Sequence, residues 1–172
     1  MAKLKQITLD IVIPLYNDEE VIKILCETIF SELNGVFKSF RLILIDDGSK
    51  DKSYQKAMEM RKLFSGIEII RLAGNFGQHR AILAGIRASD ADIVAVMDSD
   101  LQDRPEDIPI MVEKMLEEDK PMAIARRSRR VDSWWKKTTS KAFGLISNML
   151  VPFKVDPSLG AFRVLEKNVV KQ

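Results

Sequence analysis

The sequence has a single cysteine and no long apolar run, and each absence excludes a class of protein. A single cysteine, Cys26, cannot form an intrachain disulfide, and a chain without disulfides is typical of a reducing compartment. Because free cysteine is commonly buried, we expect Cys26 in the core of a helix. No apolar run approaches the roughly 20 residues of a membrane span, and the first residues lack the apolar stretch of a signal peptide. We therefore expect a soluble, cytoplasmic chain.

The sequence also lacks a strong charge and the glycine-rich phosphate loops of the common nucleotide sites. A net charge of +2 predicts no nucleic-acid partner. Neither G-x-G-x-x-G nor G-x-x-x-x-G-K-[ST] occurs after the first apolar run, which excludes a Rossmann dinucleotide site and a P-loop. The 46% hydrophobic and 30% charged content is that of an ordinary globular domain, and 172 residues can bury a full core.

Short apolar runs alternate with helical patterns along most of the chain. The alternation predicts an open, mostly parallel α/β sheet with helices on both faces. No linker or repeat divides the chain, so we expect one domain over residues 1–172. Asp103 is the expected N-cap of the fourth helix, with Pro105 in its first turn. The predicted strands are residues 7–15, 40–47, 67–72, 91–98 and 121–127, and the predicted helices are 19–33, 51–64, 78–88 and 104–118.

Polar side chains follow the end of every predicted strand. Taken singly, each group is also explained by an ordinary turn, because Asp, Asn, Gly and Ser are frequent in turns. Ligands of open α/β sheets bind beyond the carboxyl ends of the strands, so the joint arrival of these residues at one edge favours a binding site. The five groups are Pro14, Tyr16, Asn17 and Asp18; Asp46, Asp47, Gly48 and Ser49; Gly74, Asn75 and Gly77; Asp98, Ser99, Asp100 and Gln102; and Arg126 and Arg127.

Asp98 and Asp100 predict a cation site after the fourth strand. Two residues apart on an extended segment, their carboxylates point the same way. Such hard oxygen ligands suit Mg²⁺ or Mn²⁺, whose shell is usually completed by water and substrate phosphate. The following acids, Asp103, Glu106 and Asp107, also fit a solvated turn that caps a helix. We expect the cation to carry a diphosphate, with Tyr16 facing a base and Asp47 accepting hydrogen bonds from base or ribose.

Six motifs together resemble the family 2 glycosyltransferases of GT-A fold, across nearly the whole chain. The resemblance is closest to the polyprenyl-phosphate sugar transferases, the dolichol-phosphate mannose synthase type and its bacterial relatives. "DDGSKD" and "DSDLQD" are strong motifs at their positions, and "NFGQHRAILAG" points to the polyprenyl-phosphate branch. The motifs are "IVIPLYNDEE", "LILIDDGSKD", "NFGQHRAILAGI", "VMDSDLQDRPEDIP", "AIARR" and "DPSLGAFRVL".

The resemblance implies roles for individual residues. Asp18 stands where the family often has glutamate. Lys136 stands where an arginine is usual, which keeps the charge but loses the bidentate fork. By resemblance, the nucleotide is bordered by Pro14, Tyr16 and Asp18, its base and ribose are held by Ile45 and Asp47, and the donor is also contacted by Ser99. The metal is bound by Asp98, Asp100 and Gln102, and the donor phosphates are contacted by Arg127. The acceptor phosphate is received by Lys136 and Ser140.

The implied reaction is inverting transfer of a sugar from a UDP- or GDP-sugar to a polyprenyl phosphate. A lipid phosphate is already anionic, so the site needs positioning and charge stabilisation more than a base. The catalytic candidates are Asp98, Asp100, Arg127 and Asp156, the last fitting a loop-forming role equally well. One alternative is transfer to a saccharide hydroxyl in surface polysaccharide synthesis, with Asp156 or Asp103 as base. A second is a non-catalytic remnant that binds sugar-nucleotide without turnover.

The region after Arg127 differs from the rest in charge and aromatic content. Trp134 and Trp135 beside lysines fit either a membrane interface or the closing of the core. We expect residues 1–127 to bind the nucleotide-sugar and 128–172 to face the acceptor, at the inner face of the cell membrane. The chain is expected to be truncated, with any anchor beyond it, and no oligomeric state is predicted. His79 fits a helix-terminus residue, a donor contact or a proton shuttle.

Overall fold

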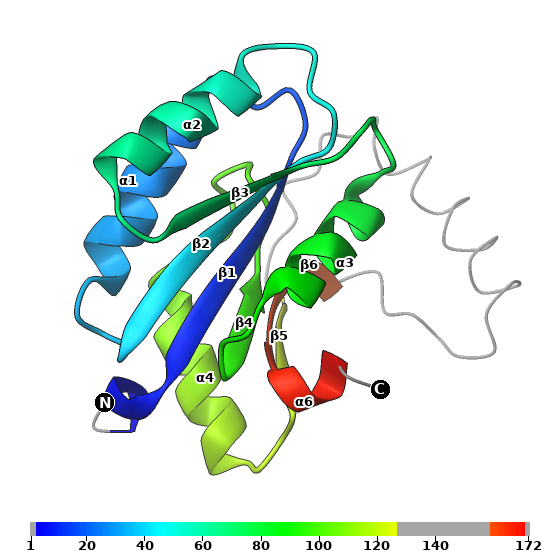
Figure 1. The fold of residues 1–172 in the computed structure, drawn as a ribbon. Helices are drawn as coiled ribbons and strands as arrows, with labels where there is room; N and C mark the ends of the chain where they lie inside the picture. Colours follow the sequence, from blue (N-terminus) through cyan, green and yellow to red (C-terminus); the bar gives the residue numbers. More distant parts are fainter. Residues whose placement is uncertain (1–2, 127–158, 171–172) are drawn as a thin grey trace, which may run out of the picture.

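The computed structural model describes residues 3–126 and 159–170, which build a six-stranded sheet covered by helices (Figure 1). The strands are β1 (Thr8–Leu15), β2 (Ser39–Asp46), β3 (Ile67–Arg71), β4 (Ile93–Val96), β5 (Met122–Arg126) and β6 (Leu159–Glu166). The helices are the short 3-10 helix η1 (Leu4–Gln6), α1 (Ile22–Leu33), α2 (Ser53–Leu63), α3 (Gln78–Ala88), α4 (Asp107–Glu117) and α6 (Lys167–Val170). All five predicted strands and all four predicted helices are present at the expected places.

The sheet has the order β3-β2-β1-β4-β6-β5 and is mostly parallel. β1 pairs in parallel with β2 and β4, and β2 pairs in parallel with β3. β6, which the sequence patterns did not predict, runs antiparallel between β4 and β5. The predicted fold class, an open and mostly parallel sheet with helices on both faces, is confirmed.

Strand alternation divides the core between the two faces of the sheet. On β1, Ile11 and Ile13 join the cluster beneath α1, α2 and α4, whereas Val12 points to α3. Figure 1 shows α1, α2 and α4 on one side of the sheet and α3 on the other. Cys26 is fully buried in α1, as expected, and burial raises the pKa of its thiol to about 12, helped by the nearby charge of Glu27.

Helix α3 packs on the sheet with Gly85 directly against side chains of β1 and β2. A Cβ at this position would lie 2.4 Å from Val12 Cγ1, closer than real contacts allow, and 3.1 Å from Ile45 Cδ1, which is a tight contact. The glycine therefore fixes the depth at which α3 packs. Since α3 begins at Gln78, its depth also sets where the first turn of the helix meets the sheet edge.

The fourth helix begins later than the sequence suggested. α4 starts at Asp107 with Glu106 as its N-cap, so the expectation of Asp103 as N-cap was wrong. Asp103 is instead buried, and its carboxylate accepts the backbone N–H of Asp98 at 3.0 Å. Its bond to the strand-end backbone explains why the helix cannot use Asp103 as a cap.

None of the helices among residues 3–126 and 159–170 is long and apolar enough to cross a membrane.

Candidate active site

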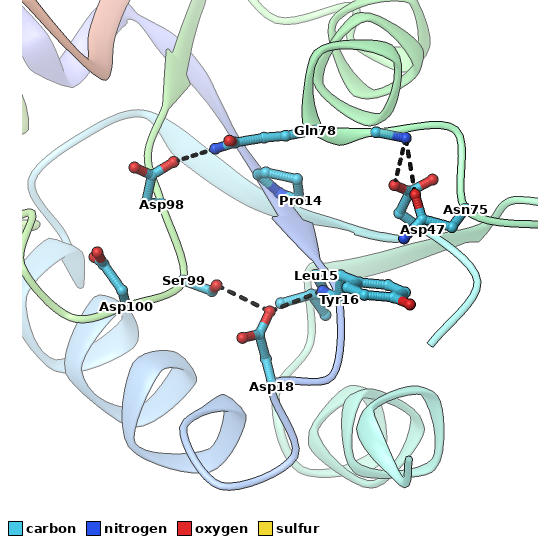
Figure 2. A pocket seen from close by; sticks show the side chains of 11 residues that line it. Pro14, Leu15, Tyr16, Asp18, Asp47, Asn75, Gln78, Asp98, Ser99 and Asp100 are labelled. Atoms are coloured by element: carbon cyan, nitrogen blue, oxygen red, sulfur yellow. Dashed lines mark hydrogen bonds between the residues drawn. The ribbon is translucent and has the colours of Figure 1, made fainter. Parts of the chain in front are cut away.

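A cavity of about 390 Å³ opens at the carboxyl ends of β1, β2 and β4 (Figure 2). It lies where parallel strands end and helices begin, which is the usual ligand position in open α/β sheets. Polar and apolar atoms share its wall, so it suits a ligand with both a flat ring and charged groups. The lining residues are Pro14, Leu15, Tyr16, Asp18, Asp47, Asn75, Gly77, Gln78, Asp98, Ser99 and Asp100.

One end of the cavity carries the acids that follow β4. Asp98 is half-buried and Asp100 is exposed, and both line the same wall. The side-chain amide of Gln78 donates to Asp98 Oδ1 at 2.6 Å, and the backbone N–H of Gln102 donates to Asp100 Oδ1 at 3.1 Å. The two carboxylates are therefore held at the cavity by the start of α3 and by their own loop.

The other end of the cavity carries Tyr16 and Asp47. Tyr16 is 41% exposed, and its ring lies along the cavity edge, where a flat ligand can cover it. Asp47 is buried, and its two oxygens accept the backbone N–H groups of Phe76 and Gly77, each at 2.8 Å. The two hydrogen bonds of the Asp47 carboxylate hold the loop before α3 in place. Its remaining lone pairs can accept further hydrogen bonds.

Asp18 joins the two ends of the cavity. Its Oδ2 accepts the Tyr16 backbone N–H at 2.8 Å and the Ser99 hydroxyl at 3.0 Å (Figure 2). Its own backbone N–H donates to the Ser53 hydroxyl at 2.7 Å. Asp18 thus ties the loop after β1 to the loop after β4 and to the start of α2.

The loops after β1 and β2 are bonded to each other at several further points. The backbone N–H of Asn17 donates to the Ser49 hydroxyl, and the Asn17 side-chain oxygen accepts the Lys50 N–H. Asp51 accepts the N–H of Glu19 as well as bonds from Ser53. Burial raises the pKa of Asp51, but these hydrogen bonds outweigh it and hold the pKa below the usual value. The rim of the cavity is therefore built before any ligand binds.

Gly48 brings the loop after β2 against the loop after β3. Its φ of 71° lies in the left-handed region, and a Cβ there would sit 2.6 Å from the backbone carbon of Gly74. Only glycine satisfies both conditions. The contact places Asp47 and Asn75 next to each other on the cavity wall.

The structure gathers most of the donor-site residues expected from the sequence, but not all. Ile45 is fully buried beneath α3 and does not line the cavity, so its side chain is not available to a base or ribose. Gln102 is exposed just beyond the lining. Pro14, Tyr16, Asp18, Asp47, Asp98, Ser99 and Asp100 line the cavity. Arg127, Lys136, Ser140 and Asp156, like Trp134 and Trp135, lie outside the described residues.

Leu15 and Gln78 line the cavity although neither was among the polar groups expected at the strand ends, and Asn75 was expected there without an assigned role. Asn75 uses its side-chain oxygen to accept the Gly77 N–H at 3.2 Å, and Gln78 reaches Asp98. Asn75 was expected at the ligand edge as part of the polar group after the third strand, but the sequence assigned it no individual role. Gln78 is the first residue of α3, and nothing in its local sequence distinguishes it from an ordinary helix start.

The two acids after β4 fit a hard divalent cation. Among the described residues no group of three or more His, Cys, Asp or Glu side chains could hold a metal ion. Asp98 and Asp100 offer two carboxylates at one cavity, and Gln102 follows with an amide oxygen. This all-oxygen set, completed by water and phosphate oxygens, is the kind that Mg²⁺ and Mn²⁺ take.

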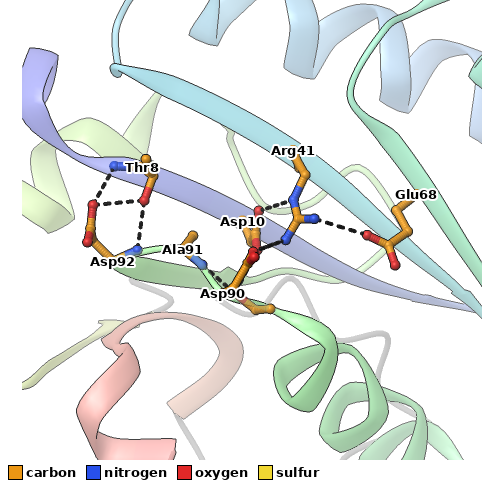
Figure 3. Close-up of polar contacts among 8 residues, drawn as sticks. Thr8, Asp10, Arg41, Glu68, Asp90, Ala91 and Asp92 are labelled. Atoms are coloured by element: carbon orange, nitrogen blue, oxygen red, sulfur yellow. Dashed lines mark hydrogen bonds and ion pairs between the residues drawn. The ribbon is translucent and has the colours of Figure 1, made fainter.

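A second polar cluster, drawn in Figure 3, lies near the amino ends of β1, β2 and β3, whereas the cavity lies at the carboxyl ends of the strands. Arg41 contacts three acids there: Asp10 at 2.7 Å, Glu68 at 3.3 Å and Asp90 at 2.5 Å. Asp10 is buried, and it also accepts the Ser89 hydroxyl at 2.7 Å. The cluster joins β1, β2, β3 and the end of α3, so we interpret it as structural.

Residues 10–169 match the sequence pattern of the glycosyl transferase family 2. The chain belongs to this family. The match includes the strand ends that build the cavity, and the predicted identification as a family 2 glycosyltransferase is confirmed.

Individual relatives of this family 2 chain agree with the assignment. It is 34% identical over 164 residues to an uncharacterised glycosyltransferase of Synechocystis, covering 95% of the chain and 52% of the relative. It is 41% identical over 132 residues to an undecaprenyl-phosphate 4-deoxy-4-formamido-L-arabinose transferase of Proteus mirabilis, covering 76% of the chain and 40% of that protein. The chain thus spans about half the length of the curated relatives it matches.

Among solved structures, the fold resembles glucosyl-3-phosphoglycerate synthase from Mycobacterium tuberculosis in complex with Mn²⁺, UDP-glucose and glycerol 3-phosphate. The TM-score is 0.68 at 20% identity, covering 98% of the chain and 60% of the other protein. The likeness confirms the predicted GT-A fold.

Proposed function

We propose that this chain forms the donor site of an inverting, metal-dependent glycosyltransferase that moves a sugar from a UDP- or GDP-sugar to a polyprenyl phosphate. One observation carries the proposal: a single cavity joins Tyr16 and Asp47 at one end to Asp98 and Asp100 at the other. A nucleoside diphosphate has the same division, with a flat base at one end and a charged diphosphate at the other.

The residues at the two ends have different tasks. Tyr16 covers the base, and the segment around Asp47 and Asn75 faces the base and ribose. Asp98 and Asp100, with Gln102, hold Mg²⁺ or Mn²⁺, which when bound neutralises the charge that develops on the departing diphosphate. Arg127, one residue beyond β5, adds a second positive charge to the same group. Because Asp98 and Asp100 are already held by hydrogen bonds from Gln78 and Gln102, they need little reorganisation when the cation binds.

The acceptor proposed is the phosphate of a polyprenyl phosphate. The relative from Proteus mirabilis is named as a transferase to undecaprenyl phosphate, which supports this acceptor class. A phosphate monoester is anionic at neutral pH, so once it is positioned its oxygen can attack the anomeric carbon of the sugar directly. The nucleoside diphosphate leaves from the opposite side, and the configuration of the anomeric carbon is inverted. Lys136 and Ser140 are the residues proposed to receive it, and Asp156 completes the proposed catalytic set.

A lipid acceptor places the reaction at a membrane surface. We propose the inner face of the cell membrane, where Trp134 and Trp135 would lie at headgroup level beside Lys136 and Lys137. The nucleotide-sugar then enters from the aqueous side, through the open cavity.

The test is calorimetric titration of the chain with UDP-glucose and GDP-mannose, with and without Mn²⁺. We expect one nucleotide-sugar to bind, with Mn²⁺ raising its affinity by about tenfold or more, equal to about 1.4 kcal/mol. In Asp98→Ala and Asp100→Ala variants the Mn²⁺ effect should disappear. Glu117→Ala removes an exposed acid from the end of α4 and should leave binding unchanged.

Two results would contradict the proposal. Failure of both nucleotide-sugars to bind would exclude a donor site in this cavity. Donor binding without transfer to undecaprenyl phosphate in vesicles, measured in the full-length protein, would exclude the lipid acceptor. Transfer to a soluble saccharide in that assay would instead identify a hydroxyl acceptor.

A further inference from the structure

The start of α3 reaches across the cavity to the first acid of the proposed metal site. The Gln78 side-chain amide donates to Asp98 Oδ1 at 2.6 Å, a short hydrogen bond to a carboxylate (Figure 2). Both residues line the cavity, so the bond lies on the ligand side of the fold.

We propose that Gln78 is a positioning residue for the metal site, which fixes the orientation of the Asp98 carboxylate; this rests on the function proposed above. A hydrogen bond to one oxygen limits rotation of the carboxylate group and leaves its charge intact. A neutral amide is suited to this because, unlike lysine or arginine, it does not oppose the approach of a cation. Hydrogen bonds of this kind orient metal ligands and tune metal affinity.

Gln78 can act in this way because its backbone is fixed from two sides. Immediately before it, the N–H groups of Phe76 and Gly77 are held by Asp47 at 2.8 Å each. Behind it, Gly85 lets α3 pack directly on β1 and β2. The Gln78 side chain therefore extends from an anchored helix start, and its amide reaches Asp98 from a defined position.

The same contacts connect the two ends of the cavity. Asp47, at the nucleoside end, holds the segment that carries Gln78, and Gln78 holds Asp98 at the metal end. The inference predicts that losing the Gln78 amide weakens the metal while sparing the nucleoside end. A purely structural role for Gln78 would weaken both ends or neither.

The experiment replaces Gln78 by methionine, which has a similar length and helix propensity but no N–H donor. Gln55→Met makes the same change on the exposed face of α2 and is the matched control. For each protein, Mn²⁺ is titrated at saturating UDP or GDP, whichever binds the wild-type chain, with electron paramagnetic resonance reporting free Mn²⁺. The same nucleotide is then titrated without metal.

We expect Gln78→Met to raise the Kd of Mn²⁺ by about 10–100-fold. The metal-free Kd of the nucleotide should change by less than about threefold, and Gln55→Met should match wild type in both titrations. Gln78→Asn keeps the amide but is too short to span the same distance, and it should show the same loss. It serves as the second variant if methionine lowers the melting temperature.

An unchanged Mn²⁺ affinity in the Gln78 variants would overturn the positioning role while leaving the donor site intact. Equal weakening of metal and metal-free nucleotide binding would also overturn it, since Gln78 would then support the whole cavity. If wild type binds neither UDP nor GDP, the proposed function itself fails, and the inference fails with it.

Discussion

At the scale of single residues, Arg41 shows how one side chain stabilises a buried charge. The Asp10 carboxylate is only 2% exposed, yet it stays ionised at neutral pH because Arg41 donates two hydrogen bonds to it. Burial raises the pKa of Asp10, but the bonds from Arg41 and Ser89 outweigh it, and the pKa lies below its usual value. Arg41 is itself partly exposed, so solvent screens part of the attraction.

Arg41→Met should lower the free energy of unfolding by about 1–3 kcal/mol near neutral pH, because it leaves Asp10 buried without its main donor. A group with a lowered pKa stabilises the fold above its unfolded pKa, and that contribution is lost as pH falls through the folded pKa. The difference between wild type and Arg41→Met should therefore shrink below about pH 4. Urea unfolding at several pH values measures it.

The matched control for this prediction is Arg61→Met, which removes an exposed arginine from α2. It should change stability by less than about 0.5 kcal/mol at each pH. A difference between wild type and Arg41→Met that stays constant, or grows, towards acid pH would contradict the account of Asp10.

At the scale of elements, the cavity is shaped by loops that touch through glycine. Gly48 adopts a φ of 71°, and its missing Cβ leaves room for the backbone of Gly74. The loop after β2 carries Asp47, whose bonds hold the loop after β3. Displacing either loop should therefore move the end of the cavity that carries Tyr16 and Asp47, which we propose holds the nucleoside, although neither Gly48 nor Gly74 lines the cavity.

Gly48→Ala should lower the free energy of unfolding by about 2 kcal/mol or more, because it adds left-handed strain and overlap with Gly74. We also expect weaker nucleotide binding, since Asp47 and its loop must move. Gly74→Ala is the control: its added Cβ meets nothing within 4 Å. Thermal unfolding and nucleotide titration measure both effects, and equal behaviour of the two variants would contradict the role of the contact.

At the scale of the whole molecule, the sheet depends on a strand from the far end of the chain. β6 lies between β4 and β5 and pairs with both. Val164 is fully buried at its centre, with Ala95 of β4 and Ala123 of β5 as its neighbours across the sheet. Although β5 is the next strand after β4 in sequence, the two are separated in the sheet by β6.

Val164→Asp should destabilise the fold by about 3 kcal/mol or more, because it buries a charge without a partner. Asn168→Asp introduces the same acid at an exposed position of α6 and should be nearly neutral. Urea unfolding gives the stabilities, and amide hydrogen exchange should show lost protection in β4 and β5. Full protection of β5 in Val164→Asp would show that β5 does not depend on β6.

The sequence predicted the elements whose pattern is local and missed what depends on distant partners. Near-continuous apolar runs identified β1 to β5, whereas β6 was missed because it pairs with strands that lie far away in sequence. Strand ends correctly indicated the cavity, because topology brings parallel strand ends together. Alternation along β2 turns the Ile45 side chain towards α3 and away from the cavity, which the resemblance did not indicate, and Gln78 was missed because its partner Asp98 is twenty residues away.

The place of β6 in the sheet also determines when the fold can close during synthesis on the ribosome. β5 emerges well before residues 159–166, yet it has no strand to join until they follow. At about 5–20 residues per second, β4 keeps an open edge and β5 stays unpaired for some seconds. Open strand edges pair readily with other chains. For the nascent chain, this interval is the time of greatest exposure to aggregation, and a chaperone that shields the β4 edge would act there.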